Sequence, residues 1–577
     1  MAALVLVLAL LPRLASLTTF ITYDEYDQLH FAAQFLQAIL RGDAGGALVL
    51  GYPGVPTMAL GALGLWVQHQ LALLPWGEEG GMVAPPVSPV LPLPSPDVQT
   101  HRLFLPLVTV QQAAPASDFA TVLDTVTQHP LVYLGAVRLP VMVAVSLMLV
   151  VLFVLLRRLV STPLALAAAL AISFNPLLLA LSKIIHVDAL LAVFMFASFL
   201  AFVVYLEKGS KGILIGSGVF GALAVLSKTP ALILGPILMA TGLIYIFTSP
   251  QPALRAIRRR RFLLAMAGWL VVAAVAFVIF WPAMWSRPMF AIEWILRNIV
   301  QNNQQTRSGS GVFWGWFNSD RNPLYYTYAF PFRWTPLATF GALASIGLAV
   351  TGYRQRGRAM RSFAVRILPL VLSLQSFIVI FIAAISIISR RSVRYTLPAM
   401  LPLDLLAILG LAWLLQVLTR RISSLKQRPA SLWKLVLALL LAIQIEQVIL
   451  YHPYYYAYFN PLLGGYRLAP YLVNMGLGEG LDAAARYLNQ EPDAVSSTTA
   501  SWFIRQFEPY YRGKSVEIFD VNDVVTADHT VFYITQIQLG FPTKELLDYF
   551  DDRLPEKVIT LGGVDYVWIY PGPIIGR

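Results

Sequence analysis

The sequence predicts a polytopic α-helical membrane protein of about eleven spans with a small α/β domain at its C-terminal end. Apolar runs of about 20 residues, the length that crosses a bilayer, recur along most of the chain. Hydrophobic residues make up 57% of the 577 residues and charged residues only 12%, with a mean hydropathy of +0.66. After residue 451 the composition becomes that of an ordinary soluble domain. The chain as a whole is therefore not a soluble protein.

The predicted spans follow the hydropathy of the chain. They cover residues 4–20, 139–156, 163–181, 187–206, 212–227, 230–247, 262–281, 335–352, 363–388, 395–415 and 432–450. Basic residues cluster on every second connection, at 157–158, 255–261, 354–361 and 420–428. The positive-inside rule makes these connections cytoplasmic, with the N-terminus inside and the C-terminal domain outside. The net charge of +12 is thus an orientation signal and does not indicate a nucleic-acid partner.

Two segments between the first and second spans are expected to lie on the outer surface. Asp27 to Leu40 has apolar residues at helical spacing, which is typical of an interfacial helix. Val55 to Leu74 is apolar enough to span, but a span there would turn all four basic clusters outwards. We therefore expect a membrane domain over residues 1–451 that includes a first outer loop over 21–137. The Pro-rich stretch 85–96 within that loop is expected to be irregular.

Residues 452–577 are predicted to form an extracytoplasmic α/β domain, since about 125 residues suffice for a small domain. Periodicity indicates helices over 480–489 and 544–550. Strands are expected over 516–519, 531–535 and 564–570. The chain has no Cys, which excludes disulfides, thiolate metal sites and a Cys nucleophile.

A cluster of acids follows the first apolar run, where Asp24, Glu25 and Asp27 stand within four positions. Carboxylates are costly near hydrocarbon, so acids there are usually functional, although they can also simply mark the water interface. Asp24-Glu25, the amphipathic segment after it and Gly51-Tyr52-Pro53-Gly54-Val55-Pro56-Thr57-Met58 resemble the first outer loop of GT-C glycosyltransferases. Among these, the resemblance is to protein O-mannosyltransferases, lipid A aminoarabinose transferases and their bacterial relatives.

The resemblance implies an acid–base site at the outer surface. It implies that Asp24 or Glu25 is the catalytic base, and we prefer Asp24. It also implies that Asp188 faces the acids of the first loop, with His186 as a further ligand or substrate contact. No cofactor is required by the sequence, but the resemblance allows a divalent metal at these residues. The alternative for His186 and Asp188 is a polar cap on a tight turn.

Two further residues enter through the resemblance. Arg138 opens the second span in Tyr133-Leu134-Gly135-Ala136-Val137-Arg138-Leu139-Pro140, and an Arg at this place is an active-site residue of the O-mannosyltransferases. Its alternative is an interfacial Arg whose head snorkels to water. Tyr52 stands in the substrate loop where the O-mannosyltransferases have His, so a role that depends on the imidazole does not carry over.

Three arginines in one short outer connection, Arg390, Arg391 and Arg394, break the charge bias of the other outer loops. Such a concentration needs an anion, and a polyprenyl phosphate at that depth is the natural one. Lys228 lies at the outer end of a short hairpin and matches a Ser/Thr-Lys position of the family. We expect these four cations to bind the lipid phosphate, the alternatives being a misassigned span for the arginines and a snorkelling side chain for Lys228.

The sequence thus predicts an inverting glycosyltransferase of the cytoplasmic membrane. Its expected donor is a polyprenyl-phosphate sugar, with mannose or a related sugar, and its acceptor is a hydroxyl on a protein, lipid or glycan. The other partner is membrane lipid, and no nucleic acid is expected. The alternative function is a transporter or flippase of a lipid-linked or polar substrate, which would place its charges at the membrane midplane.

Overall fold

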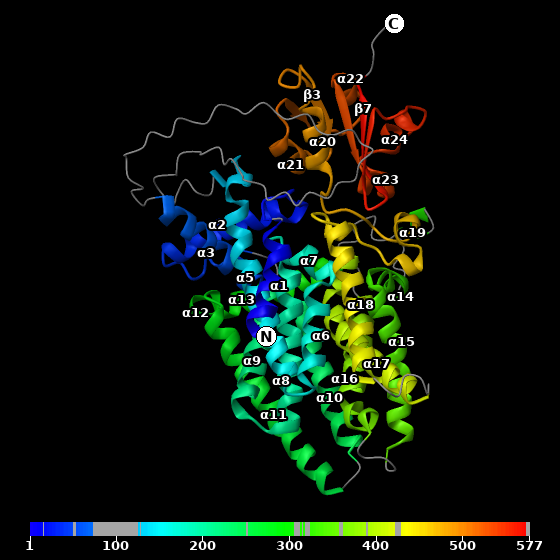
Figure 1. Cartoon of the computed structure of the whole chain (residues 1–577). Helices are drawn as coiled ribbons and strands as arrows, with labels where there is room; N and C mark the ends of the chain where they lie inside the picture. Colours follow the sequence, from blue (N-terminus) through cyan, green and yellow to red (C-terminus); the bar gives the residue numbers. More distant parts are fainter. Residues whose placement is uncertain are drawn as a thin grey trace, which may run out of the picture.

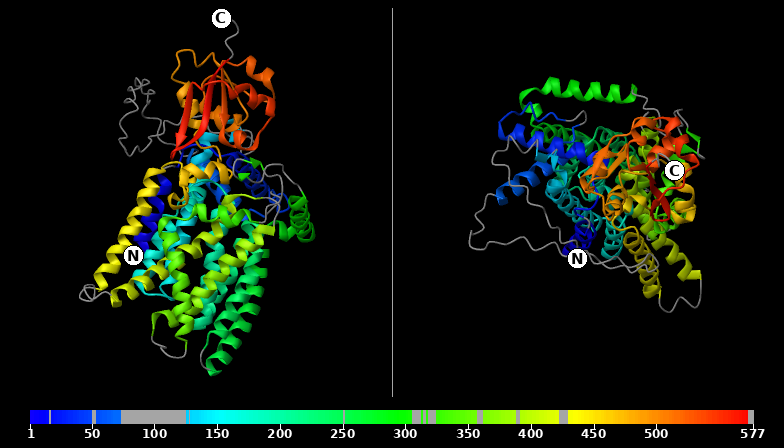
Figure 2. Two further views of the ribbon diagram at one scale, coloured as in Figure 1. Left: turned by 90° about the vertical axis from the view of Figure 1, so that its right-hand side faces the viewer. Right: turned by 90° about the horizontal axis from the view of Figure 1, so that it is seen from above.

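The computed structural model describes residues 1–15, 17–49, 53–72, 125–126, 128–249, 252–304, 312–313, 316–317, 324–356, 362–387, 391–421 and 429–572. A helical bundle carries a small sheet on one end, as Figures 1 and 2 show. We call this the sheet end of the bundle. The predicted fold class, a helical membrane protein with a C-terminal α/β domain, is confirmed.

Among the residues that the structure describes, seven helical stretches are long and apolar enough to cross a membrane. They are Pro130–Leu156 (α5), Val187–Lys208 (α8), Thr229–Phe247 (η1 and α10), Arg255–Phe280 (within α11, Pro252–Phe280), Pro336–Arg354 (α15), Phe363–Ile387 (α16) and Val393–Thr419 (η3 and most of α17, Leu397–Arg421). The predicted span at 163–181 is a bent pair, α6 (Thr162–Ser173) and α7 (Pro176–Ser182). The other three predicted spans coincide with shorter apolar helices, α1 (Ala2–Leu14), α9 (Lys211–Ser227) and residues 438–450 of α18 (Pro429–Leu450).

The bend of 59° between α6 and α7 has a local cause. Pro176 has no N–H for a continuous helix, and the Asn175 side chain accepts from the N–H groups of the next turn. The Asn175 amide in turn donates to the buried carboxyl of Asp404 at 2.9 Å. Gln444 donates to the carbonyl of Ala171, which the break leaves open, at 2.6 Å. The break thus separates α7 from α6. Helix α7 ends at Ser182, and residues 183–186 form a non-helical link before α8.

The two surface segments are helices, α2 (Tyr23–Leu40) and α3 (Val55–Ala72). They pack against each other and against α5 near the sheet end (Figure 1). A Cβ on Gly64 of α3 would lie 1.9 Å from the Ala136 carbonyl oxygen, so only glycine permits this approach to α5. Within the described residues, α3 is not among the helices apolar enough to span. Residues 85–96 lie outside the described part of the chain.

The C-terminal sheet has five strands in the order β4-β3-β5-β7-β6. The strands are β3 (Thr498–Ser501), β4 (Lys514–Val516), β5 (His529–Tyr533), β6 (Lys557–Leu561) and β7 (Val564–Pro571). Strand β3 is parallel to both neighbours, whereas β5, β7 and β6 pair antiparallel. The predicted helices are present as α20 (Leu481–Leu488) and α24 (Lys544–Asp551).

Two strand predictions need correction. The strand predicted over 516–519 lies earlier, because Asp520 already caps the next helix, α22 (Val521–Val525). The strand predicted over 531–535 ends at Tyr533, where α23 (Ile534–Leu539) begins.

The remaining elements are α12 (Ala283–Ser286), α13 (Pro288–Gln304), β1 (Val312–Phe313), β2 (Trp316–Phe317), α14 (Tyr325–Ala329), η2 (Pro331–Arg333), η5 (Tyr455–Ala457), η6 (Pro461–Leu463), α19 (Gly465–Leu472), α21 (Ile504–Phe507) and η7 (Glu508–Tyr510).

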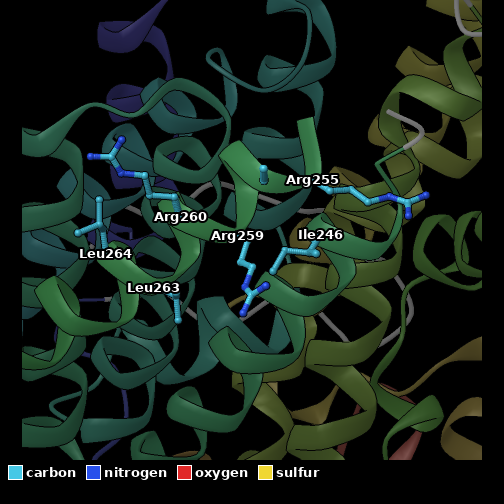
Figure 3. Close-up of a pocket in the computed structure, with 7 residues that line it drawn as sticks. Ile246, Arg255, Arg259, Arg260, Leu263 and Leu264 are labelled. Atoms are coloured by element: carbon cyan, nitrogen blue, oxygen red, sulfur yellow. The ribbon is translucent and has the colours of Figure 1, made fainter. Parts of the chain in front are cut away.

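The opposite end of the bundle holds the end of α10 and the first turns of α11, whose arginines are predicted to be cytoplasmic (Figure 1). A groove there is lined by Arg255, Arg259 and Arg260 beside Ile246, Leu263 and Leu264. In Figure 3 the three guanidinium groups point in different directions. This arrangement is typical of arginines at a membrane surface and does not enclose a single anion.

Candidate active site

Five side chains from four separate connections meet at the sheet end of the bundle. Asp24 lies in the first turn of α2, and His186 and Asp188 lie at the start of α8. Lys228 follows α9, and Arg394 lies in η3 (Val393–Thr396) before α17. Each of these residues stands at or beside the end of a helix, which is why connections far apart in sequence can supply one cluster.

Arg394 is the centre of the cluster. Its guanidinium donates to Oδ2 of Asp24, and its Nε lies 3.8 Å from Oδ2 of Asp188. Lys228 donates to Oδ1 of Asp188 at 2.7 Å. The exposed fractions of the side chains are 23% for Asp24, 15% for Lys228 and 11% for Arg394. Two acids and two cations therefore form a compact, mostly buried and charge-balanced group.

His186 joins the two acids. Its Nδ1 accepts the backbone N–H of Asp188 at 3.2 Å, so a neutral ring carries its proton on Nε2. That Nε2 lies 3.6 Å from Oδ2 of Asp24. The Nδ1 atom of His186 thus caps α8, while the proton on Nε2 of the neutral ring faces Asp24.

The surroundings of Asp24 favour its charged form. Burial by itself raises the pKa of a carboxyl, but the positive charge of Arg394 beside Asp24 outweighs it. The pKa of Asp24 consequently lies well below its ordinary range. In this arrangement Asp24 is an anion at any physiological pH, and it is a weak base for as long as Arg394 contacts it.

Glu25, the neighbour of Asp24, points into the protein. Its Oε1 accepts from Arg138 Nε at 2.7 Å and from the backbone N–H of Ile185 at 3.0 Å. Its Oε2 accepts from Arg138 at 2.6 Å and from the backbone and hydroxyl of Thr22 at 3.0 and 3.2 Å. Both side chains of the pair are 0% exposed. Of the two acids predicted as alternative bases, Glu25 is therefore buried in an ion pair and Asp24 joins the cluster.

Arg138 has no donor left for a substrate. Beyond Glu25, it donates to the carbonyl oxygens of Leu17, Thr19 and Phe20 at 2.7 to 3.0 Å. These bonds use all five N–H groups of the guanidinium. Arg138 and Glu25 together hold residues 17–25, the segment that leads from α1 into α2.

We predict that Glu25→Gln mainly destabilises the protein. Removing one charge of a buried pair leaves Arg138 without its counter-ion and costs about 3–5 kcal/mol. The thermal unfolding midpoint in detergent should fall clearly, whereas Asp27→Asn, in the same helix and 51% exposed, should leave it nearly unchanged. A Glu25→Gln protein with wild-type stability and no turnover would contradict this assignment and support Glu25 as the base.

The other predicted residues are Tyr52, Arg390 and Arg391. Tyr52 and Arg390 lie outside the described residues. Arg391 is 8% exposed, and its charge acts on the phenols of Tyr326 and Tyr328. Of the four cations predicted to bind the lipid phosphate, Arg394 and Lys228 therefore lie together in the cluster, at Asp188.

Two residues, Tyr395 in contact with the cluster and Lys183 beside residues 19–20, had no predicted role. Tyr395 places its ring 4.2 Å from Lys228 Nζ and 5.6 Å from the Arg394 guanidinium carbon, both measured to the ring centroid, so it stacks beside both cations. Lys183 is 1% exposed and donates to the carbonyl of Pro453 and, at 3.3 Å, to Thr19. Burial and then the charge of Arg138 lower its pKa to about 7. Its position in the segment 183–188, which the sequence predicts to be outer, was the available sequence signal.

The donor set of the cluster does not suit a divalent metal. The carboxylates of Asp24 and Asp188 already meet Arg394 and Lys228, and Nδ1 of His186 accepts a backbone N–H. A divalent ion between the acids would lie within a few ångströms of two other cations, about the range where repulsion is strong. Within the described residues, the group spaced to share an ion is Glu491, His529 and Glu556, in the C-terminal domain.

Comparison with known proteins gives one family match and several distant structural likenesses. Residues 133–285 match the family described as dolichyl-phosphate-mannose-protein mannosyltransferase. ArnT from Cupriavidus metallidurans bound to undecaprenyl phosphate aligns over 98% of this chain and 97% of its own, at 13% identity and a TM-score of 0.45. Archaeal oligosaccharyltransferase AglB from Archaeoglobus fulgidus, in complex with an inhibitory peptide and a dolichol-phosphate, aligns over 74% of this chain and 63% of its own, at 12% identity and a TM-score of 0.35. No curated protein matches the chain.

The family match covers the part of the chain that supplies most of the cluster. His186, Asp188 and Lys228 of the cluster fall within residues 133–285, as does Arg138, the partner of Glu25. The resemblance drawn from the sequence motifs is thereby confirmed over this segment.

Proposed function

We propose that this protein is a glycosyltransferase that moves a sugar from a polyprenyl phosphate to an acceptor hydroxyl at the outer membrane surface. The observation that carries the proposal is the joining of Asp24 to Arg394, and of Asp188 to Lys228, at one end of a membrane bundle. Transfer from a lipid phosphate needs a carboxylate beside cations at the membrane surface. The family match to mannosyltransferases supports the same chemistry.

In the proposed step, Asp24 takes the proton of the acceptor hydroxyl. The acceptor oxygen forms a bond to the anomeric carbon as the bond from that carbon to the phosphate oxygen breaks. The leaving polyprenyl phosphate keeps the electron pair, and Arg394 and Lys228 stabilise its charge. A single displacement of this kind inverts the anomeric configuration. Asp188 holds both cations in place, and His186 orients Asp24.

The ion pair between Asp24 and Arg394 suggests an order of events. While Arg394 contacts Asp24, the carboxylate is a poor proton acceptor because its charge is neutralised. A donor phosphate that draws Arg394 toward itself weakens this contact and raises the basicity of Asp24. The base thus becomes effective when the donor is bound.

The substrates follow from this chemistry only as classes. The donor is a polyprenyl-phosphate sugar, for which the family match suggests mannose or a related sugar. The acceptor supplies a hydroxyl and is a protein, a lipid or a glycan. Mass analysis of lipid-linked sugars in cells that lack the protein tests the proposal: the donor should accumulate and one glycosylated product should disappear. Unchanged lipid-linked sugars and products would contradict it.

We also propose that the sheet end of the bundle faces outwards. The basic connections at the opposite end indicate a cytoplasmic side there. A reporter that is active only outside the cytoplasm, fused after Arg577, should therefore be active. The matched control is the same reporter placed in the connection between α10 and α11, which should be silent. The reverse pattern would place the candidate site in the cytoplasm and contradict the proposed orientation.

A further inference from the structure

A loop of the C-terminal domain touches the segment that carries Asp24. The loop comprises residues 476–480, between α19 and α20. The carbonyl of Leu477 accepts the backbone N–H of Tyr23, the first residue of α2, at 3.0 Å. Gly478 lies so close that an added Cβ would be 3.0 Å from the Ile21 carbonyl oxygen and 3.6 Å from Cα of Thr22. The loop therefore abuts the three residues that precede Asp24 along the chain.

The loop is itself held firmly by the sheet. Glu479 is 0% exposed, and its Oε2 accepts the Leu477 N–H at 2.6 Å and the Tyr533 hydroxyl at 3.0 Å. The same hydroxyl oxygen accepts the N–H of Gly478 at 2.9 Å. Tyr533 ends strand β5, which pairs on both sides within the sheet. The position of the loop is thus fixed by the core of the C-terminal domain.

Arg138 of the bundle forms hydrogen bonds to the residues just before this contact. Arg138 donates to the carbonyls of Leu17, Thr19 and Phe20, as described above. Residues 17–23 are therefore held between the bundle and the C-terminal loop. Contacts on both sides therefore hold the segment that leads into the first turn of α2.

A second contact lies one turn further along α2. The guanidinium of Arg505, in α21, lies 3.8 Å from Oδ1 of Asp27 and 5.0 Å from the centroid of the Tyr26 ring. Arg505 and Asp27 are 61% and 51% exposed, so the ion pair itself contributes little stability. The ion pair shows that the C-terminal domain also contacts α2 one turn beyond the loop.

We infer that the C-terminal loop 476–480 is a positioning element for Asp24, so that the C-terminal domain is part of the catalytic unit. The loop sets the first turn of α2, and the carboxylate of the next residue then meets Arg394. Displacing a reacting group by about 1 Å can cost about 10²-fold in rate. The inference rests on the proposed role of Asp24 and adds a function for the C-terminal domain.

The substitution Gly478→Ala tests the inference. Gly478 has φ +115°, which L residues rarely adopt, and the new methyl group must push against the Ile21 carbonyl. The control is Gly540→Ala, where φ is +67° but nothing lies within 4 Å of the added Cβ. Both variants carry backbone strain in the same domain, and only the first disturbs the segment before Asp24.

Turnover should be measured per bound polyprenyl phosphate, which corrects for any loss of folded protein. We expect Gly478→Ala to lower this turnover by about tenfold or more, with donor KM nearly unchanged. Gly540→Ala should stay within about twofold of wild type. Equal turnover in the two variants would overturn the inference. If Asp24→Asn also retained turnover, the proposed function would fail instead, so the two failures are distinguishable.

A cross-link gives a second test that does not depend on the folding of Gly478→Ala. The chain has no Cys, so Asp27→Cys with Arg505→Cys introduces a single exposed thiol pair. A short bifunctional thiol reagent that ties α2 to α21 should leave turnover unchanged relative to a monofunctional reagent. Loss of turnover on cross-linking would mean that the domain must leave α2 during catalysis, which would overturn a fixed positioning role.

Discussion

Asp24→Asn should lower turnover by about 10²–10⁴-fold, the usual cost of losing a general base. Asn keeps the shape of the side chain but cannot accept the acceptor proton. The same change removes the anion that neutralises Arg394, so binding of polyprenyl phosphate should become tighter or stay the same. Opposite effects on turnover and binding distinguish a lost base from a damaged donor site. Both are measured on the purified protein, as single-turnover rate and as the Kd of polyprenyl phosphate.

The matched control is Asp27→Asn, in the same helix and outside the cluster. It removes one surface charge and should change neither quantity by more than about twofold. The account is contradicted if Asp24→Asn keeps near-wild-type turnover with a verified substrate. It is also contradicted if turnover and donor binding are lost together.

Arg394→Ala should weaken both donor binding and turnover. The guanidinium is the only described group that contacts both Asp24 and Asp188 as a cation. Losing charge-assisted hydrogen bonds to a phosphate typically costs about 1.5–3 kcal/mol, which is about 10- to 150-fold in affinity. Lys should rescue only part of the loss, since it lacks the planar bidentate fork of Arg. Equilibrium binding of polyprenyl phosphate checks the prediction.

The control for Arg394 is Arg467→Ala, which changes an exposed arginine in α19 of the C-terminal domain. It should bind polyprenyl phosphate like the wild type. Arg394 would not be a phosphate ligand if Arg394→Ala bound the lipid as tightly as Arg467→Ala. Stability must be compared as well, since Arg394→Ala leaves two partly buried acids without a counter-ion.

Much of the cluster could be predicted from the sequence for a simple reason. Asp24, Asp188, Lys228 and Arg394 each stand at a span end on the same side, and hydropathy with the basic loops assigns that side. Helices that cross together bring such ends to one level of the membrane. The chemical type of each residue then indicates acid–base and phosphate-binding roles.

The difference between Asp24 and Glu25 could not be predicted. Adjacent residues on a helix differ in direction by about 100°, so one faces the cluster and the other faces Arg138. Which one does so depends on the rotation of α2, and the capping box of Thr22 and Glu25 fixes that rotation. The resemblance alone pointed to either acid.

Contacts between segments that are distant in the sequence could not be predicted either. No local pattern links Leu477 and Gly478 to residues 21–23, because that contact depends on how the sheet sits on the bundle. The short strands β3 and β6 also gave too weak an alternation to be recognised. Packing over several hundred residues decided these features, whereas periodicity reports only on neighbours.

The central claim is that the protein breaks the bond between sugar and lipid phosphate. The most direct test is to reconstitute the purified chain in vesicles with a polyprenyl-phosphate hexose and a hydroxyl acceptor. The account predicts free polyprenyl phosphate and a glycoside of inverted configuration in equal amounts, with both products lost in Asp24→Asn. Passage of the intact lipid-linked sugar across the bilayer, with no polyprenyl phosphate released, would contradict the account and indicate a flippase.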